Sequence, residues 1–206
     1  AQQELAANPD DPARLSAAIT ALQQAGKYPE AIKLMEEARA KGSLTTEDEY
    51  VLLGSLYFNQ ALSSDDPKAA ATKSIAVLNE GMSKGIMQPS AHNYLLLGKA
   101  QYLVGDIKSA MASYNKALPL ATDGEAALQI ASVLLTDSKY SESKSKAELA
   151  ISKGVKHPGV AYMVLAECER GLNHKSARIA ALKQAANDPQ TATRANELLK
   201  KLAAKK

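Results

Sequence analysis

Residues of the types that do chemistry are few in this chain and lie far apart. Among its 206 residues are three histidines and a single cysteine. His92, His157 and His174 fall in different parts of the sequence, and none has a Cys, Asp or Glu at ligand spacing on the same helix face. A zinc site needs three or four such ligands gathered at one place. We therefore expect histidines exposed at turns, with no metal site and no cofactor.

Cys168 and the aspartate pair at residues 65–66 are predicted to be structural. Cys168 lies between two glutamates, and neighbouring negative charges raise the pKa of a thiol, so we expect an unreactive, packed side chain. The aspartate pair has no third carboxylate at calcium-site spacing, and its place before Pro67 is typical of a helix start. These patterns give no catalytic residue, and we expect a protein that is not an enzyme.

The elements that would position any site are helices. The composition is 46% hydrophobic, with many Ala and Leu residues, eight Tyr, one Phe and no Trp, which suits helices packed at close range. The net charge of +3 comes from scattered lysines, so nucleic acid is not an expected partner. No run reaches the ~18 apolar residues of a membrane span, and we expect no transmembrane segment in this chain.

A repeated helix pair is clearest in residues 91–124. Tyr94, Leu97 and Gly98 are followed at fixed spacing by three residues of a second helix, namely Ala110, Tyr114 and Ala117. Between them, Gly105 supplies the left-handed conformation that ends a helix. This pattern resembles the tetratricopeptide repeat (TPR), a unit of about 34 residues. The resemblance implies an all-α fold, a TPR-type α-α superhelix, or solenoid, of about five helix pairs with a C-terminal capping helix.

Applied to the whole chain, the pattern predicts a single TPR array. The end of a preceding repeat occupies residues 1–11, helix pairs occupy residues 12–45, 46–89, 90–123, 124–158 and 159–189, and the capping helix occupies residues 190–206. Because the array begins inside a repeat, we expect the C-terminal part of a longer protein. The second unit is about eight residues too long. We assign the excess to a longer inter-helix loop around residues 63–67, followed by a helix over residues 67–84.

TPR arrays are binding scaffolds, and the resemblance implies a concave groove lined by the first helix of each unit. Its places map to Val51, Leu52, Ser55, Phe58, Asn59, Leu95, Lys99, Tyr102, Gln129 and Ser132. The middle of this groove is apolar, which suits a helix or an extended peptide of a protein partner. In the alternative interpretation, Leu95 and Leu128 pack between first helices. A groove that clamps a carboxylate is disfavoured, because Lys99 alone is basic at the corresponding places.

Residues 78–206 resemble a narrower subgroup, the periplasmic TPR proteins associated with the TonB-ExbB-ExbD systems of Gram-negative bacteria. Four segments carry this resemblance: residues 80–86, 91–94, 122–125 and 153–158. It implies localisation in the periplasm and a scaffold role in TonB-dependent uptake of iron or other nutrients, with a TonB-system component as partner. The alternative is a scaffold for cell-envelope or outer-membrane assembly that organises peptidoglycan enzymes.

Overall fold

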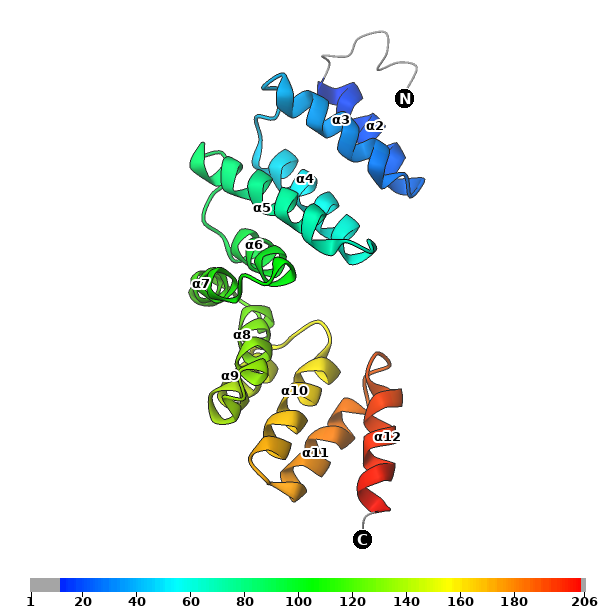
Figure 1. Ribbon diagram of the computed structural model, residues 1–206, viewed down its shortest axis with the longest axis vertical. Helices are drawn as coiled ribbons and strands as arrows, with labels where there is room; N and C mark the ends of the chain where they lie inside the picture. Colours follow the sequence, from blue (N-terminus) through cyan, green and yellow to red (C-terminus); the bar gives the residue numbers. More distant parts are fainter. Residues whose placement is uncertain (1–11, 205–206) are drawn as a thin grey trace. The chain divides into compact units, whose positions relative to one another are not determined.

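The computed structural model describes residues 12–204, which are all-α (Figure 1). Over this range the chain forms eleven α-helices and one short 3-10 helix, with no strand. They are α2 (Pro12–Gln24), α3 (Tyr28–Ala40), α4 (Glu47–Leu62), α5 (Pro67–Ser83), α6 (Ala91–Val104), α7 (Ile107–Ala117), η1 (Leu118–Leu120), α8 (Glu125–Thr136), α9 (Tyr140–Lys153), α10 (Pro158–Gly171), α11 (Lys175–Ala185) and α12 (Ala192–Ala203). The predicted end of a preceding repeat, residues 1–11, lies outside the described residues.

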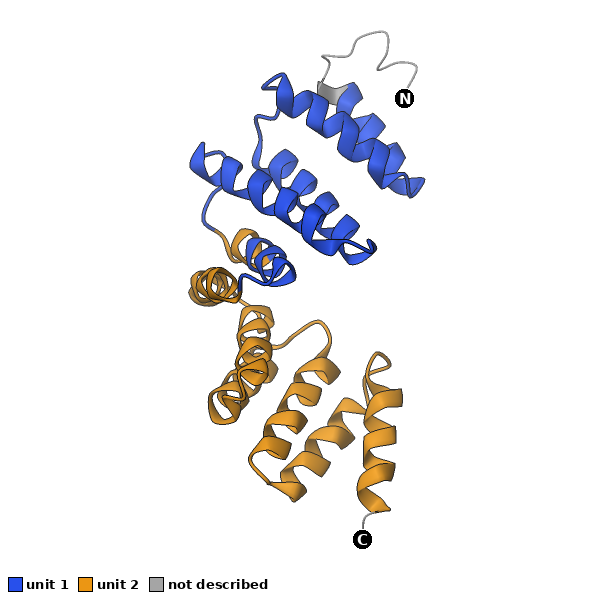
Figure 2. Ribbon diagram, viewed as in Figure 1, with its two compact units in different colours: residues 1–89, 96–106 blue, residues 90–95, 107–206 orange. Residues whose placement is uncertain are grey.

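The chain divides into two compact units (Figure 2). Unit 1 comprises residues 1–89 and 96–106, and unit 2 comprises residues 90–95 and 107–206. Consecutive helices pack as pairs within each unit: α2 with α3 and α4 with α5 in unit 1, then α8 with α9 and α10 with α11 in unit 2. Each pair buries its apolar faces against a neighbour, so no helix depends on its own propensity for stability.

Small residues and buried serines join the two helices of a pair. In unit 1, a Cβ added to Gly54 would come within 2.6 Å of Leu78 Cδ2, so a larger residue here would force the Leu78 side chain of α5 to shift. Buried Ser74 on α5 donates a hydrogen bond of 2.7 Å to the Gly54 carbonyl. In unit 2, buried Ser143 on α9 donates a bond of the same length to the Ala131 carbonyl. The buried hydroxyl of each serine therefore has a backbone acceptor on the paired helix.

Left-handed residues end several helices, as the sequence predicts for glycine. Gly42 has φ +74°, and the Ser43 N–H donates back to the Ala38 carbonyl at 2.9 Å, which closes the end of α3. Two non-glycine residues adopt the same conformation: Ser138 with φ +58° and Asn173 with φ +62°. This conformation costs a residue with a Cβ about 1 kcal/mol or more. The end of α8, at Ser138, is therefore strained.

The extra length of the second unit lies in its helices, and the prediction of a longer loop is wrong. α4 has 16 residues and α5 has 17, whereas α2 and α3 have 13 each. Only residues 63–66 separate α4 from α5. The start of α5 at Pro67 agrees with the prediction, and Asp66 accepts a hydrogen bond from the Ala69 N–H at 3.5 Å. Ala61 and Ala70 are buried where the longer helices continue to pack, which stabilises the added turns.

A polar cluster joins α3, α4 and α5 in unit 1. The Glu80 carboxylate accepts hydrogen bonds from three side chains: Lys84 Nζ at 2.7 Å, Arg39 Nε at 2.8 Å and Tyr50 Oη at 3.0 Å. Arg39 also pairs with Glu36, which accepts a hydrogen bond from Tyr57 Oη at 2.9 Å. These hydrogen bonds, above all those from Lys84 and Arg39, lower the pKa of Glu80 to about 2.

The last helix packs as the predicted capping helix should. Ala195 is fully buried, and the apolar side chains of Leu198, Leu199 and Leu202 pack against a cluster that contains Leu182 of α11. The opposite face of α12 carries exposed polar and charged residues. α12 thus covers apolar surface of α11 that would otherwise meet water.

Candidate protein-binding face

The predicted groove residues lie on first helices, but they fall in both units. Seven belong to unit 1: Val51, Leu52, Ser55, Phe58 and Asn59 on α4, with Lys99 and Tyr102 on α6. Three belong to unit 2: Leu95 on α6, with Gln129 and Ser132 on α8. We call the surface formed in unit 1 by α2, α4 and the later part of α6 the first-helix face.

On α4 the predicted residues form one half-buried stripe. Val51, Leu52 and Phe58 are partly exposed and pack against the apolar core of unit 1. Ser55 is half-buried and Asn59 is exposed along the same helix. Steps of three and four residues keep this set on one side of a helix. These apolar side chains pack against the core on one side and are exposed to solvent on the other, so they could contact a partner.

On α6 the predicted residues differ in their surroundings. Tyr102 is 39% exposed and presents aromatic surface to solvent. Lys99 is half-buried, and it forms no ion pair within the described part of unit 1. Leu95 lies in unit 2, is partly buried, and packs beside buried Tyr114 and Ala117 of the second helix α7. Tyr102 and Lys99 are therefore better placed than Leu95 to meet a partner.

On α8 of unit 2, neither predicted residue is open to a partner in the way Tyr102 is. Gln129 and Ser132 are half-buried, and the Ser132 hydroxyl donates to the Leu128 carbonyl of its own helix at 3.0 Å. Leu128 itself is buried, with 5% exposure. The strongest features of the candidate face are accordingly those of unit 1.

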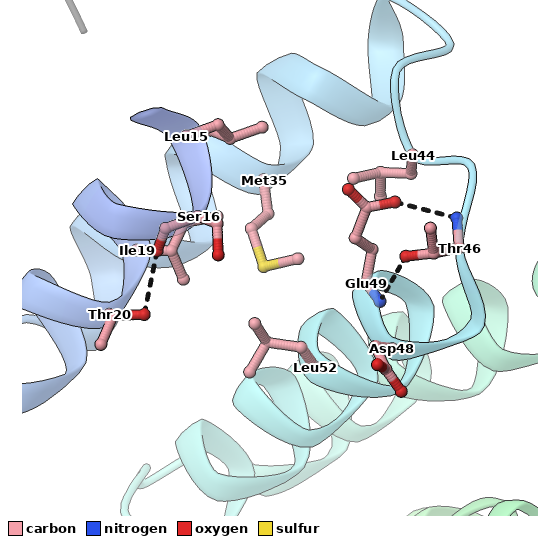
Figure 3. A pocket seen from close by; sticks show the side chains of 10 residues that line it. All are labelled: Leu15, Ser16, Ile19, Thr20, Met35, Leu44, Thr46, Asp48, Glu49 and Leu52. Carbon is pink, nitrogen blue, oxygen red and sulfur yellow. Dashed lines mark hydrogen bonds between the residues drawn. The ribbon is translucent and has the colours of Figure 1, made fainter. Parts of the chain in front are cut away.

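A pocket of about 280 Å³ opens between α2 and α4 in unit 1 (Figure 3). Its apolar lining comes from four segments: Leu15 and Ile19 of α2, Met35 of α3, Leu44 of the following linker and Leu52 of α4. Met35 is fully buried and Ile19 is 5% exposed, so the floor of the pocket is part of the core. A cavity of this size lies just below the ~300 Å³ at which sites for whole small molecules begin. It suits one or two side chains of a partner.

Polar groups form the rest of the pocket lining. Ser16 and Thr20 lie on α2, and the Thr20 hydroxyl donates to the Ser16 carbonyl at 2.9 Å. Thr46 caps α4, and Glu49 Oε2 accepts hydrogen bonds from the Thr45 and Thr46 N–H groups at 2.8 and 2.9 Å. This capping box holds the Glu49 carboxylate in place beside the pocket.

The sequence indicated only part of this pocket. Leu52 and the start of α4 follow from the TPR spacing, but the floor residues do not. Met35 belongs to a second helix and Leu44 to a linker, so a rule that maps places on first helices passes over both. The sequence signal that could have indicated Leu44 is an apolar residue in a linker just before a helix start rich in acidic residues.

The residues of chemical type remain dispersed. Over residues 12–204, no three His, Cys, Asp or Glu side chains are placed to hold a metal ion together. His174 does contact a carboxylate, which the sequence did not predict: its Nδ1 lies 2.7 Å from Glu169 Oε2, and Lys144 Nζ lies 2.7 Å from the other oxygen. The pKa of the Cys168 thiol is raised, and burial is the largest cause. The negative charge of Glu169, which the sequence suggested as the cause, contributes less.

No protein-family model matches the sequence, and the search of curated proteins gave no match. Solved structures do match. MamA superposes with a TM-score of 0.68 at 17% identity, covering 84% of this chain and 95% of MamA. A tetratricopeptide repeat protein from Parabacteroides merdae gives a TM-score of 0.72 at 12% identity, covering 92% of this chain and 71% of that protein.

A third match is a chain of the APC/C hetero-tetramer Cut9-Hcn1, with a TM-score of 0.67 at 14% identity. It covers 98% of this chain and 38% of that one. At such identities the likeness establishes the fold alone. The predicted fold class, an all-α TPR-type α-α solenoid, is confirmed. Among residues 12–204, no helix is both long and apolar enough to cross a membrane.

Proposed function

We propose that this chain is a scaffold that binds a segment of a protein partner on the first-helix face of unit 1. The observation that carries the proposal is the pocket between α2 and α4, where partly exposed Leu15 and Leu52 border an opening above the buried side chains of Ile19 and Met35. Closing this pocket with a partner side chain would remove apolar surface from water at about 25 cal/mol per Å². The fold supports the same role, since one structural neighbour is a subunit of a protein assembly.

The face extends from this pocket along α4 towards Phe58 and includes Tyr102 of α6. Aromatic side chains that are partly exposed and anchored at their base supply large contact area at little cost in conformational entropy. Phe58 packs against the core of unit 1 at its base, and Tyr102 is 39% exposed. Lys99 adds a charge without an internal ion pair in the described part of unit 1. We therefore place the main contacts at the pocket and at these two aromatics.

We further propose that the partner belongs to a TonB-type energy-transduction system and that the protein works in the periplasm. This context rests on the sequence resemblance of residues 78–206. A scaffold role without catalysis is part of the same proposal.

Calorimetric titration of the chain with the periplasmic segment of a TonB-type protein tests the proposal. We expect Phe58→Ala and Tyr102→Ala each to weaken binding by about 1 to 3 kcal/mol, because buried aromatic anchors dominate such interfaces. Lys99→Ala should cost less and reduce the salt dependence of binding. Circular dichroism of each variant controls for folding.

Full affinity in both aromatic variants would contradict the first-helix face as the site. No binding by the parent chain would contradict the TonB context and favour envelope assembly. In that case the same three variants should be tested against lipoproteins or peptidoglycan enzymes encoded beside this chain.

A further inference from the structure

We infer that the pocket between α2 and α4 selects a protein segment with one large apolar side chain and a Lys or Arg beside it. This inference deepens the proposed function and rests on it. It concerns the chemistry of the segment, whichever protein supplies it.

The apolar half of the inference follows from the floor of the pocket. Leu15, Ile19, Met35, Leu44 and Leu52 converge on the opening from four separate segments of unit 1 (Figure 3). Over the apolar part of the lining water finds few polar partners, whereas an aliphatic or aromatic side chain would gain contacts with Leu15 and Leu52 at the opening. A Leu, Met or Phe of a partner therefore fits.

The basic half follows from the charges at the pocket. Its lining residues include Asp48 and Glu49 and not one Lys, Arg or His. Neither carboxylate forms an ion pair within the part of unit 1 that the structure describes. Glu49 is held by two backbone N–H groups, which fix its position without a countercharge. Asp48 is exposed at the mouth, so its negative charge is available to a partner.

The first turn of α4 explains part of this acidity. Glu47, Asp48 and Glu49 all stand at the helix N-terminus, where negative charge stabilises the helix dipole. That role needs no pocket beside it. The same arrangement nevertheless places two negative charges at the edge of an apolar opening, so a segment with a basic residue gains attraction there and a C-terminal carboxylate is repelled. The pocket has the opposite charge preference to a site that clamps carboxylates.

The experiment is selection of peptides from a phage-displayed library of random twelve-residue sequences, with the full 206-residue chain as target. We expect the parent chain to enrich peptides with a large apolar residue within a few positions of Lys or Arg. Asp48→Lys should shift the enriched residues towards Asp and Glu and weaken a parent-selected peptide about fivefold to tenfold. Glu30→Lys is the matched control. It makes the same charge change in the first turn of α3, outside the pocket, and should leave selection unchanged.

A second pair of variants tests occupancy of the pocket without changing charge. Thr20 and Thr72 are both exposed and each donates its hydroxyl to the carbonyl four residues earlier, but only Thr20 lines the pocket. Thr20→Trp should fill the opening and lower affinity for the selected peptide at least tenfold. Thr72→Trp on α5 should not. Equal thermal melts of the two variants would show that folding is not the cause.

Enrichment that ignores Asp48→Lys and Thr20→Trp would overturn this inference and leave a protein-binding function elsewhere on the chain. Enrichment of acidic peptides by the parent chain would overturn it as well. If the parent chain enriches no peptide at all, both the inference and the proposed function fail.

Discussion

At the residue scale, the Glu80 cluster shows how a few polar side chains fix the packing of three helices. Its carboxylate, on α5, receives hydrogen bonds from Arg39 of α3, Tyr50 of α4 and Lys84, the residue that follows α5. The side chain is 25% exposed, so solvent screens these charges only in part. The cluster lies on unit 1, which also carries the pocket, and it stabilises the pairing of α4 with α5.

We predict that Glu80→Gln lowers the free energy of unfolding by about 1 to 2 kcal/mol at neutral pH. The pKa of Glu80 is lowered in the folded state to about 2, from about 4.3 in an unfolded chain. Its contribution is therefore complete above about pH 4.3 and is lost as the pH falls towards 2. Urea unfolding of parent and variant across this range measures the difference.

The control for this prediction is Glu37→Gln, on exposed α3 surface, which should change stability by less than about 0.5 kcal/mol. A stability difference between parent and Glu80→Gln that stays constant from pH 7 to pH 2 would contradict the assigned role of the carboxylate.

Ser138 gives a second prediction at this scale. Its φ of +58° is left-handed, and a serine there costs more than a glycine. Ser138→Gly should therefore raise the free energy of unfolding by about 0.5 to 1 kcal/mol. Ser141→Gly, placed inside the first turn of α9, should lower it by a similar amount. Thermal melts of both variants measure these changes. A melting temperature for Ser138→Gly below that of the parent chain would contradict backbone strain at Ser138.

At the element scale, the sequence predicted the helix pairs because each break has its own chemistry. Gly42, Gly85 and Gly105 end helices in left-handed conformations, and Pro67 starts one. The length of α4 and α5 could not be predicted in the same way. Comparison with the repeat length shows that the second unit has extra residues, but it does not show where they lie. Because the segments beside the turn are rich in Ala, they can lengthen the helices as readily as the loop. Tertiary packing of Ala61 and its neighbours decided the outcome.

The candidate site was also predictable only in part. Leu52, Phe58 and Tyr102 follow from the places that the TPR resemblance assigns to the groove on each first helix, and helical periodicity keeps such places on one face. The pocket depends on where Met35 and Leu44 come to lie, and that depends on how α2, α3 and α4 pack together. Spacing along one helix holds no information about a space shared by four segments.

Removal of residues 191–206 tests α12 as an element. We predict that the truncated chain associates or loses helicity, because Leu182 and Ala185 of α11 would lose the cover that Ala195 and Leu199 provide. Sedimentation and circular dichroism measure the two outcomes. Removal of residues 205–206 alone is the control and should change neither. A monomeric truncated chain with an unchanged melt would make this segment a dispensable tail.

At the scale of the whole molecule, the chain is an all-α array of helix pairs that resembles known TPR structures at low sequence identity. Such a fold stacks similar units and leaves function to the residues that each unit exposes. In unit 1 those residues include an apolar pocket with an acidic mouth and two partly exposed aromatics. These residues support our proposal that the chain binds a protein segment on the first-helix face.

Amide chemical-shift mapping tests this role most directly. The isotope-labelled 206-residue chain would be titrated with the peptide that the parent chain enriches most. We predict that shift changes concentrate on α2 and α4, around Thr20, Asp48 and Leu52. Exposed residues of the second helices, such as Lys33 on α3 and Asn79 on α5, should not move. Changes centred on Lys33 and Asn79, with α2 and α4 unaffected, would contradict binding on the first-helix face.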